Sequence, residues 1–85
     1  MPLNPPAVPE DDFIRLRVKL GQLRAERGFT YDTLAAEAGI SRSILVALET
    51  GKARNGRPVQ ASLAVWWRIA KALDLSLAEL LSVID

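Results

Sequence analysis

The sequence has 85 residues, which is enough for one small domain and too few for two hydrophobic cores. Hydrophobic residues make up 49% and charged residues 25%, as in ordinary folded domains, and no apolar run approaches the ~18 residues that span a bilayer. The chain has no cysteine and no histidine, which excludes disulfides, thiolate metal sites and the usual general base. Because the start also lacks the pattern of a signal peptide, we expect a cytoplasmic binding module without a cofactor, and not an enzyme.

The charge is distributed unevenly along the chain. All 11 Lys and Arg residues lie between Arg15 and Lys71, together with only four acidic residues, so this segment carries +7 although the whole chain carries +1. A concentrated basic segment is what a phosphate-binding face needs. The alternative is a normally solvated helical surface.

The N-terminal part is predicted to contain an irregular arm followed by a helix. Four of the five prolines lie in residues 1–10, and proline lacks the amide donor that a helix interior requires, so the folded domain is expected to cover residues 11–85. The first helix is predicted from Asp11 to Arg27, before a stop at Gly28. Its core face is expected to carry Phe13, Leu16, Leu20 and Leu23, and a weaker apolar stripe carries Ile14, Val18 and Ala25.

Two short helices joined by a tight turn are predicted next. Thr30 suits the N-cap of the first of them, Gly39 suits its end, and Ser41 suits the N-cap of the second. Such a turn sets two helices at a steep angle, so that the second protrudes and can enter a major groove. The side chains expected to point inward are Leu34, Ala35, Ala38, Leu45 and Leu48.

The C-terminal third is predicted to form a loop and two further helices. Residues 50–61 contain Gly, Asn and Pro, as loops do. Ser62 begins a fourth helix, and the stretch SLAE from Ser76 to Glu79 has the spacing of a capping box that opens a fifth. The core face of the fourth helix is expected to carry Leu63, Trp66, Trp67, Ile69, Ala70 and Leu73. The fold class predicted from these elements is an all-α bundle of five helices.

One combination of residues resembles the phage-repressor-like helix-turn-helix family of the lambda-repressor and Cro type. The residues that carry the resemblance are Leu34, Ala35, Gly39, Ile40, Ser41, Leu45, Leu48, Glu49 and Gly51. It extends over roughly residues 20–81, with LRAERGFT before the motif, ALETGK at its end and SLAVWWRIAKALDLSLAELL after it. The resemblance implies a compact five-helix fold and sequence-specific binding of double-stranded DNA as a homodimer.

The resemblance also implies roles for individual residues. Base edges are expected to face Arg42, Ser43 and Ala47, and the apolar Ile44 and Val46 can meet a thymine methyl group. The residues that the resemblance implies near phosphates are Tyr31, Thr50 and Lys52. Thr30, the cap next to Tyr31, is expected there as well. Arg24 is expected to pair with Glu49, and the residues themselves agree, because an unpaired charge beside an apolar face would be costly.

Two features depart from the family pattern or extend it. Tyr31 stands where the family usually has Gln, and the loop after Gly51 is longer than usual. That loop brings Arg54, Asn55 and Arg57, which either contact DNA or form a merely solvated basic loop. The side chains predicted to form a dimer interface are Leu77, Leu81, Val83 and Ile84; the alternative is that they cover Trp66 and Trp67.

Three functions fit these observations. The first is a bacterial or phage-encoded, nucleoid-associated transcriptional regulator, most simply a repressor that binds a palindromic operator. The second is the antitoxin of a toxin–antitoxin pair, with the toxin as a protein partner. The third is a protein-interaction module without DNA binding, which the apolar outer face of the third helix supports and the basic segment opposes, because protein interfaces are depleted in Lys. Enzymatic use of Ser41, Ser43 or Thr30 is not expected, because no base stands ready to activate them.

Overall fold

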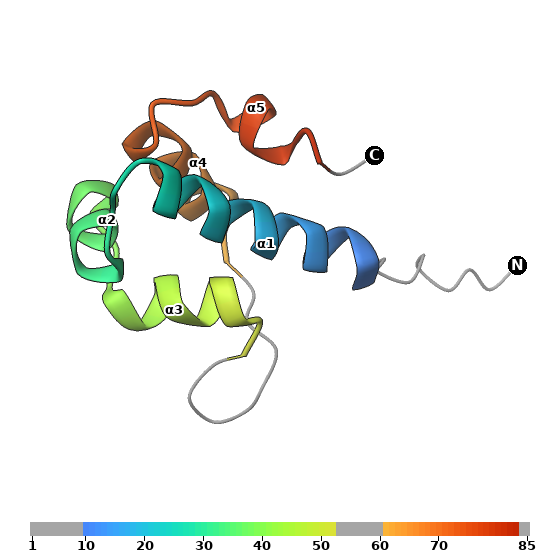
Figure 1. The fold of residues 1–85 in the computed structure, drawn as a ribbon, viewed down its shortest axis with the longest axis horizontal. Helices are drawn as coiled ribbons and strands as arrows, with labels where there is room; N and C mark the ends of the chain where they lie inside the picture. Colours follow the sequence, from blue (N-terminus) through green and yellow to red (C-terminus); the bar gives the residue numbers. More distant parts are fainter. Residues whose placement is uncertain (1–9, 53–60, 84–85) are drawn as a thin grey trace, which may run out of the picture.

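The computed structural model describes residues 10–52 and 61–83, and these residues form an all-α bundle without a strand. The helices are α1 (Glu10–Glu26), α2 (Tyr31–Ala38), α3 (Arg42–Thr50), α4 (Leu63–Ala72) and α5 (Leu77–Leu81) (Figure 1). The predicted fold class is therefore confirmed. None of the helices in the described part is long and apolar enough to cross a membrane.

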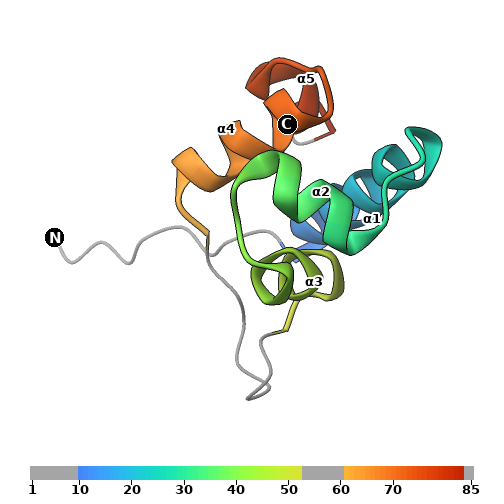
Figure 2. The ribbon, with the colours of Figure 1, turned by 90° about the vertical axis from the view of Figure 1, so that its left-hand side faces the viewer.

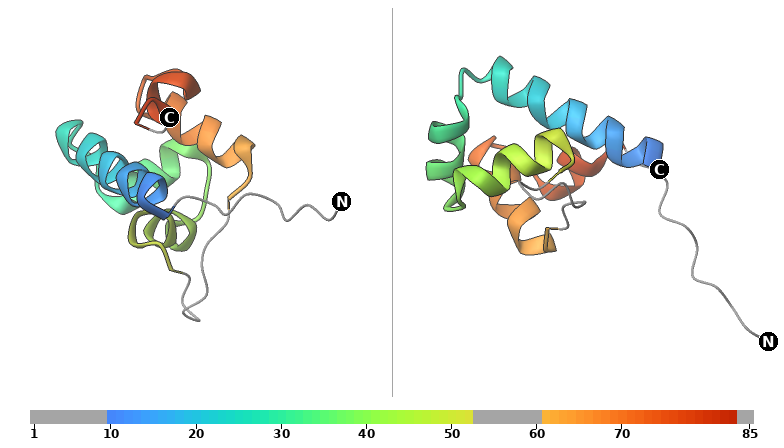
Figure 3. Two further views of the ribbon diagram at one scale, coloured as in Figure 1. Left: turned by 90° about the vertical axis from the view of Figure 1, so that its right-hand side faces the viewer. Right: turned by 90° about the horizontal axis from the view of Figure 1, so that it is seen from below.

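The helices lie on two sides of α2. Helices α4 and α5 lie above α2, and α3 lies below it, as both Figure 1 and Figure 2 show. Helix α1 runs along the bundle and packs against α3 on one side and α5 on the other. Seen from below, α3 lies in front of the other helices (Figure 3), so one of its sides is left uncovered by the rest of the described bundle.

Hydroxyl caps begin four of the helices as predicted. The side chains of Thr30, Ser41 and Ser62 each accept a hydrogen bond from the backbone N–H three residues further on. At α5, Ser76 accepts from the N–H of Glu79 and donates its own N–H to the Glu79 carboxylate, which lowers the pKa of that carboxyl. Each such cap contributes about 1 kcal/mol of helix stability, so these starts are determined locally.

The core is built from the inward faces of all the described helices. Its members are Leu16, Leu20, Leu23, Leu34, Ala35, Ala38, Leu45, Leu48, Ile69, Ala70, Leu73 and Leu80. The predicted apolar faces of α2 and α3 are thus confirmed, as is most of that of α1. This core fixes α3 against α1 and α2 and so positions the surface described below.

Three side chains predicted to be in the core are instead exposed. The exposed fractions are 41% for Phe13, 64% for Leu63 and 52% for Trp67. Phe13 lies in the first turns of α1, which extend beyond both α3 and α5 (Figure 1). On α4, Trp66 packs against the core, whereas Trp67, one step of 100° further round the helix, is exposed.

Two further boundaries differ from the prediction. The predicted arm included residue 10, which begins α1, and the predicted loop included Thr50, which is the last residue of α3. Residues 1–9 and 53–60 lie outside the described part. Helix α3 ends at Gly51, whose φ of 82° is a left-handed conformation that suits glycine.

Candidate nucleic-acid interface

The turn between α2 and α3 is fixed by backbone geometry. Gly39 has a φ of 69°, and the N–H groups of Gly39 and Ile40 donate to the carbonyl oxygens of Ala36 and Ala35. This arrangement satisfies the last carbonyl groups of α2. From α4, Arg68 Nη1 also donates to the carbonyl of Gly39 at 3.4 Å. The start of α3 is thus held by contacts from two other helices.

Helix α3 has one buried face and one exposed first turn. Leu45, Ala47 and Leu48 are buried. In contrast, Arg42, Ser43 and Ile44 are exposed, and Val46 is half-buried. The structure therefore brings three of the five predicted base-reading side chains together on the surface, whereas Ala47 offers little of its methyl group to a partner.

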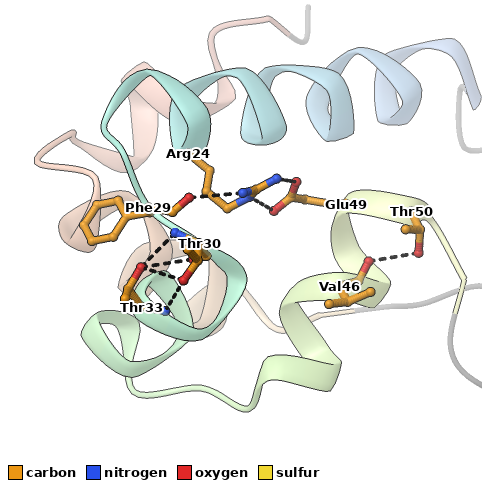
Figure 4. Close-up of polar contacts among 7 residues, drawn as sticks. All are labelled: Arg24, Phe29, Thr30, Thr33, Val46, Glu49 and Thr50. Atoms are coloured by element: carbon orange, nitrogen blue, oxygen red, sulfur yellow. Dashed lines mark hydrogen bonds and ion pairs between the residues drawn. The ribbon is translucent and has the colours of Figure 1, made fainter.

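The predicted pair of Arg24 and Glu49 is present and joins α1 to α3. Arg24 Nε donates to Glu49 Oε2 at 2.8 Å, and Nη2 donates to Oε1 at 3.2 Å (Figure 4). The remaining terminal nitrogen, Nη1, donates to the carbonyl of Phe29 at 3.1 Å. Hydrogen bonding to Glu49 raises the pKa of Arg24. The guanidinium of Arg24 therefore joins α1 to α3 and to the segment that precedes α2.

A glycine on α1 makes room for this pair. A Cβ atom added at Gly21 would lie 3.1 Å from Glu49 Oε1, which is closer than ordinary van der Waals contact. Position 21 thus lets the carboxylate of Glu49 lie directly against α1. No local signal in the sequence points to this role of Gly21.

A second ion pair, which the sequence did not indicate, joins α2 to α3. Arg42 Nε lies 3.1 Å from Asp32 Oδ1, and both side chains are exposed. The ring of Tyr31 lies close to two cations, with its centroid 5.6 Å from Cζ of Arg42 and 4.2 Å from Cζ of Arg24. Such distances are those of cation–π contacts. Tyr31 therefore connects the Arg24–Glu49 pair to the exposed Arg42–Asp32 pair.

The residues predicted near phosphates fall into two groups around α3. Thr30 caps α2, and its hydroxyl accepts from the N–H of Thr33. At the other end, Thr50 is exposed and donates its hydroxyl to the carbonyl of Val46 at 2.9 Å (Figure 4), and Lys52 is exposed. Arg54, Asn55 and Arg57 lie outside the described residues.

Arg17 adds a cation at the C-terminal end of α3 that the sequence analysis missed. A Cβ atom added at Gly51 would lie 2.8 Å from both Cζ and Nε of Arg17. The guanidinium of Arg17 on α1 therefore lies directly against Gly51, the glycine that caps α3. Gly51 is followed in the chain by Lys52. Only the crossing of α1 and α3 brings these residues together.

A surface helix that follows a glycine turn, with its first turn exposed and its other face buried, defines the helix-turn-helix class of DNA-binding proteins. The chain belongs to the helix-turn-helix family, whose sequence profile matches residues 20–80. Its structure is also similar to the crystal structure of the restriction-modification controller protein C.AhdI from Aeromonas hydrophila. The TM-score is 0.68 and the sequence identity 31%, over 82% of this chain and 97% of that one.

No protein of curated function matches the sequence significantly. The family and the architecture nevertheless agree with the resemblance found in the residues themselves. The protein is a DNA-binding transcriptional regulator.

Proposed function

We propose that this protein is a sequence-specific regulator, most simply a repressor, that binds a palindromic operator as a homodimer with α3 in the major groove. The observation that carries the proposal is the exposed first turn of α3, because recognition helices contact base edges through their N-terminal residues. The pair of Arg24 and Glu49 supports it by holding α3 rigidly against α1.

Base contacts are assigned to the first turn of α3. The Arg42 guanidinium can donate to O6 and N7 of a guanine, a contact that contributes ~1–3 kcal/mol of discrimination. Ser43 can donate or accept but distinguishes bases poorly. Ile44, and to a smaller extent Val46, can contact a thymine methyl group. We therefore expect a half-site with a guanine opposite Arg42 and thymines beside it.

Phosphate contacts are assigned to the residues around both ends of α3. Near the start, the phenol of Tyr31 and the N-terminal turn of α2 after Thr30 supply donors. Near the end, Thr50 and Lys52 are supplemented by Arg54, Asn55 and Arg57. Each neutralised phosphate contributes about −0.9 to the slope of log affinity against log salt. Replacing Arg54 and Arg57 together should flatten this slope without changing the base preference.

Dimerisation is assigned to the region of α5. Leu77, Leu81 and Val83 are only half-buried, although Leu81 and Val83 also pack against the core. Ile84 lies outside the described residues. Two copies related by symmetry would place two α3 helices one DNA turn apart, or ~34 Å, and thereby double the number of base contacts. Sedimentation that shows a monomer at tens of micromolar, with and without DNA, would contradict the dimer.

A second, narrower candidate function is the control of restriction–modification genes. The observation that favours it is the similarity to C.AhdI, which spans almost the whole of that controller protein. If this function is correct, the protein binds duplex DNA from the promoter of a neighbouring methyltransferase or endonuclease gene. Absence of such genes near its own, together with an operator elsewhere, would exclude it and leave the general regulator.

The decisive test is selection of bound sequences from random duplex DNA, followed by the same selection with Arg42→Ala. The intact protein should select a two-fold symmetric site, and the variant should lose the preference for one guanine in each half-site. Ile44→Asp is the companion variant, since it removes the apolar contact. If no sequence is selected, and Ile44→Asp instead abolishes binding of a protein partner, α3 is a protein-docking surface.

A further inference from the structure

The ion pair between Arg42 and Asp32 restricts the orientation of the arginine to which base contact is assigned. The closest contact of the pair runs through Nε of Arg42, which lies 3.1 Å from Asp32 Oδ1. The side chain of Arg42 has five N–H donors in a rigid planar fork. A partner at Nε leaves the terminal edge, formed by Nη1 and Nη2, for a second partner. Within the described residues, this contact with Asp32 is ionic, and neither terminal nitrogen of Arg42 donates a hydrogen bond to another described residue.

The aromatic ring of Tyr31 provides a second restraint on the same guanidinium. Its centroid lies 5.6 Å from Cζ of Arg42 and 4.2 Å from Cζ of Arg24. Arg24 itself is held by Glu49 and by the carbonyl of Phe29. Arg42 is therefore close to a carboxylate of α2 and to a ring that also contacts the hydrogen-bonded guanidinium of Arg24.

We propose that Asp32 is a positioning residue that holds Arg42 through Nε and presents its Nη1 and Nη2 edge to a guanine. The inference rests on the proposed function, because it assigns Asp32 to the arginine that contacts bases. Asp32 itself touches no base. Its role is to restrict the rotamers of a long side chain before DNA arrives, so that less conformational freedom is lost on binding.

This role explains an acidic side chain beside a DNA-binding surface. Asp32 carries the charge that phosphates repel, so it weakens binding to every sequence alike. It improves binding only where Arg42 finds a guanine. A carboxylate in this place therefore increases the ratio of specific to non-specific affinity, which is the quantity that decides how a regulator is distributed over a genome.

The test compares base preference among variants of α2. Competition binding with the selected operator and with an operator changed at the guanine gives the preference of each protein. Asp32→Ala should reduce the preference about twofold, as expected for loss of an exposed ion pair. It should also strengthen binding to unrelated DNA. Asp32→Glu keeps the negative charge that pairs with Arg42 and should retain most of the preference.

Two controls isolate the effect. Glu37→Ala removes the same charge from the same helix, away from Arg42, and should leave the preference unchanged. In an Arg42→Ala background, Asp32→Ala should cause no further loss of preference, since the arginine that it orients is gone. Thermal melting of each variant shows that the fold is retained.

The possible failures are distinguishable. If Arg42→Ala loses the guanine preference but Asp32→Ala keeps or increases it, base contact by Arg42 stands and the positioning role is wrong. An equal loss from Asp32→Ala with and without Arg42 would also overturn it. If Arg42→Ala changes no base preference, both the assigned base contact and this inference fall.

Discussion

Two ion pairs hold α3 to its neighbours, and they differ in almost every physical respect. In the pair that ties α3 to α1, 6% of the Glu49 side chain and 20% of the Arg24 side chain are exposed. In the pair that ties α3 to α2, 78% of the Asp32 side chain and 60% of the Arg42 side chain are exposed. The first pair has two hydrogen bonds between its members and a third to a backbone carbonyl, whereas the second is a single contact.

The difference separates a structural cation from a functional one. Breaking a buried pair leaves its partner uncompensated in a poorly solvated place, so Arg24 cannot leave Glu49 without cost. An exposed pair contributes little, because water and salt replace the partner easily. Arg42 can therefore offer its terminal nitrogens to DNA, while Arg24 remains part of the fold. The ring of Tyr31 lies close to both guanidinium groups and so connects the two ion pairs.

The largest effect is expected from breaking the buried pair. Glu49→Ala should lower the free energy of unfolding by about 3 kcal/mol, the low end for buried pairs, because a fifth of the Arg24 side chain remains exposed. Glu49→Gln can still accept from Arg24 and should lose less. Urea denaturation measures both. DNA binding by the folded fraction should persist, and a Glu49→Ala variant that unfolds like the parent would remove the distinction between the two pairs.

An intermediate effect is expected at the ring between the pairs. Tyr31→Leu removes both cation–π contacts and should lower the free energy of unfolding by roughly 1 kcal/mol. Tyr31→Phe keeps the ring and should unfold like the parent. If Tyr31→Phe loses as much stability as Tyr31→Leu, the hydroxyl and not the ring connects the two arginines.

The smallest effect on stability is expected from breaking the exposed pair. Asp32→Ala should change the free energy of unfolding by no more than about 0.5 kcal/mol, as is usual for exposed substitutions. The same denaturation curves, repeated at low and high salt, provide the check. A loss comparable to that of Glu49→Ala would mean that the Arg42–Asp32 pair supports the fold, and Arg42 would then not be free to contact DNA.

The helices, the residues at which they start and most of the core could be predicted from the sequence. Caps such as Ser41 and Ser76 act within four residues, and the apolar spacing of Leu16, Leu20 and Leu23 is a property of one helix. These features depend on neighbours in the chain, so patterns alone predict them. The resemblance to a known family supplied the pairing of Arg24 with Glu49, which lie far apart in the sequence.

The extent to which each helix is covered by its neighbours, and the residues that meet where two helices cross, could not be predicted in this way. Phe13 and Leu63 continue apolar faces, yet they are exposed because burial requires a neighbouring helix at that height. Gly21 acquires a role only where Glu49 lies against α1. Asp32 meets Arg42 because a glycine turn folds α3 back beside α2 at one particular angle. A sequence pattern shows the spacing of apolar residues along one helix. Contacts between helices depend on the crossing angles, and these are determined by packing throughout the core.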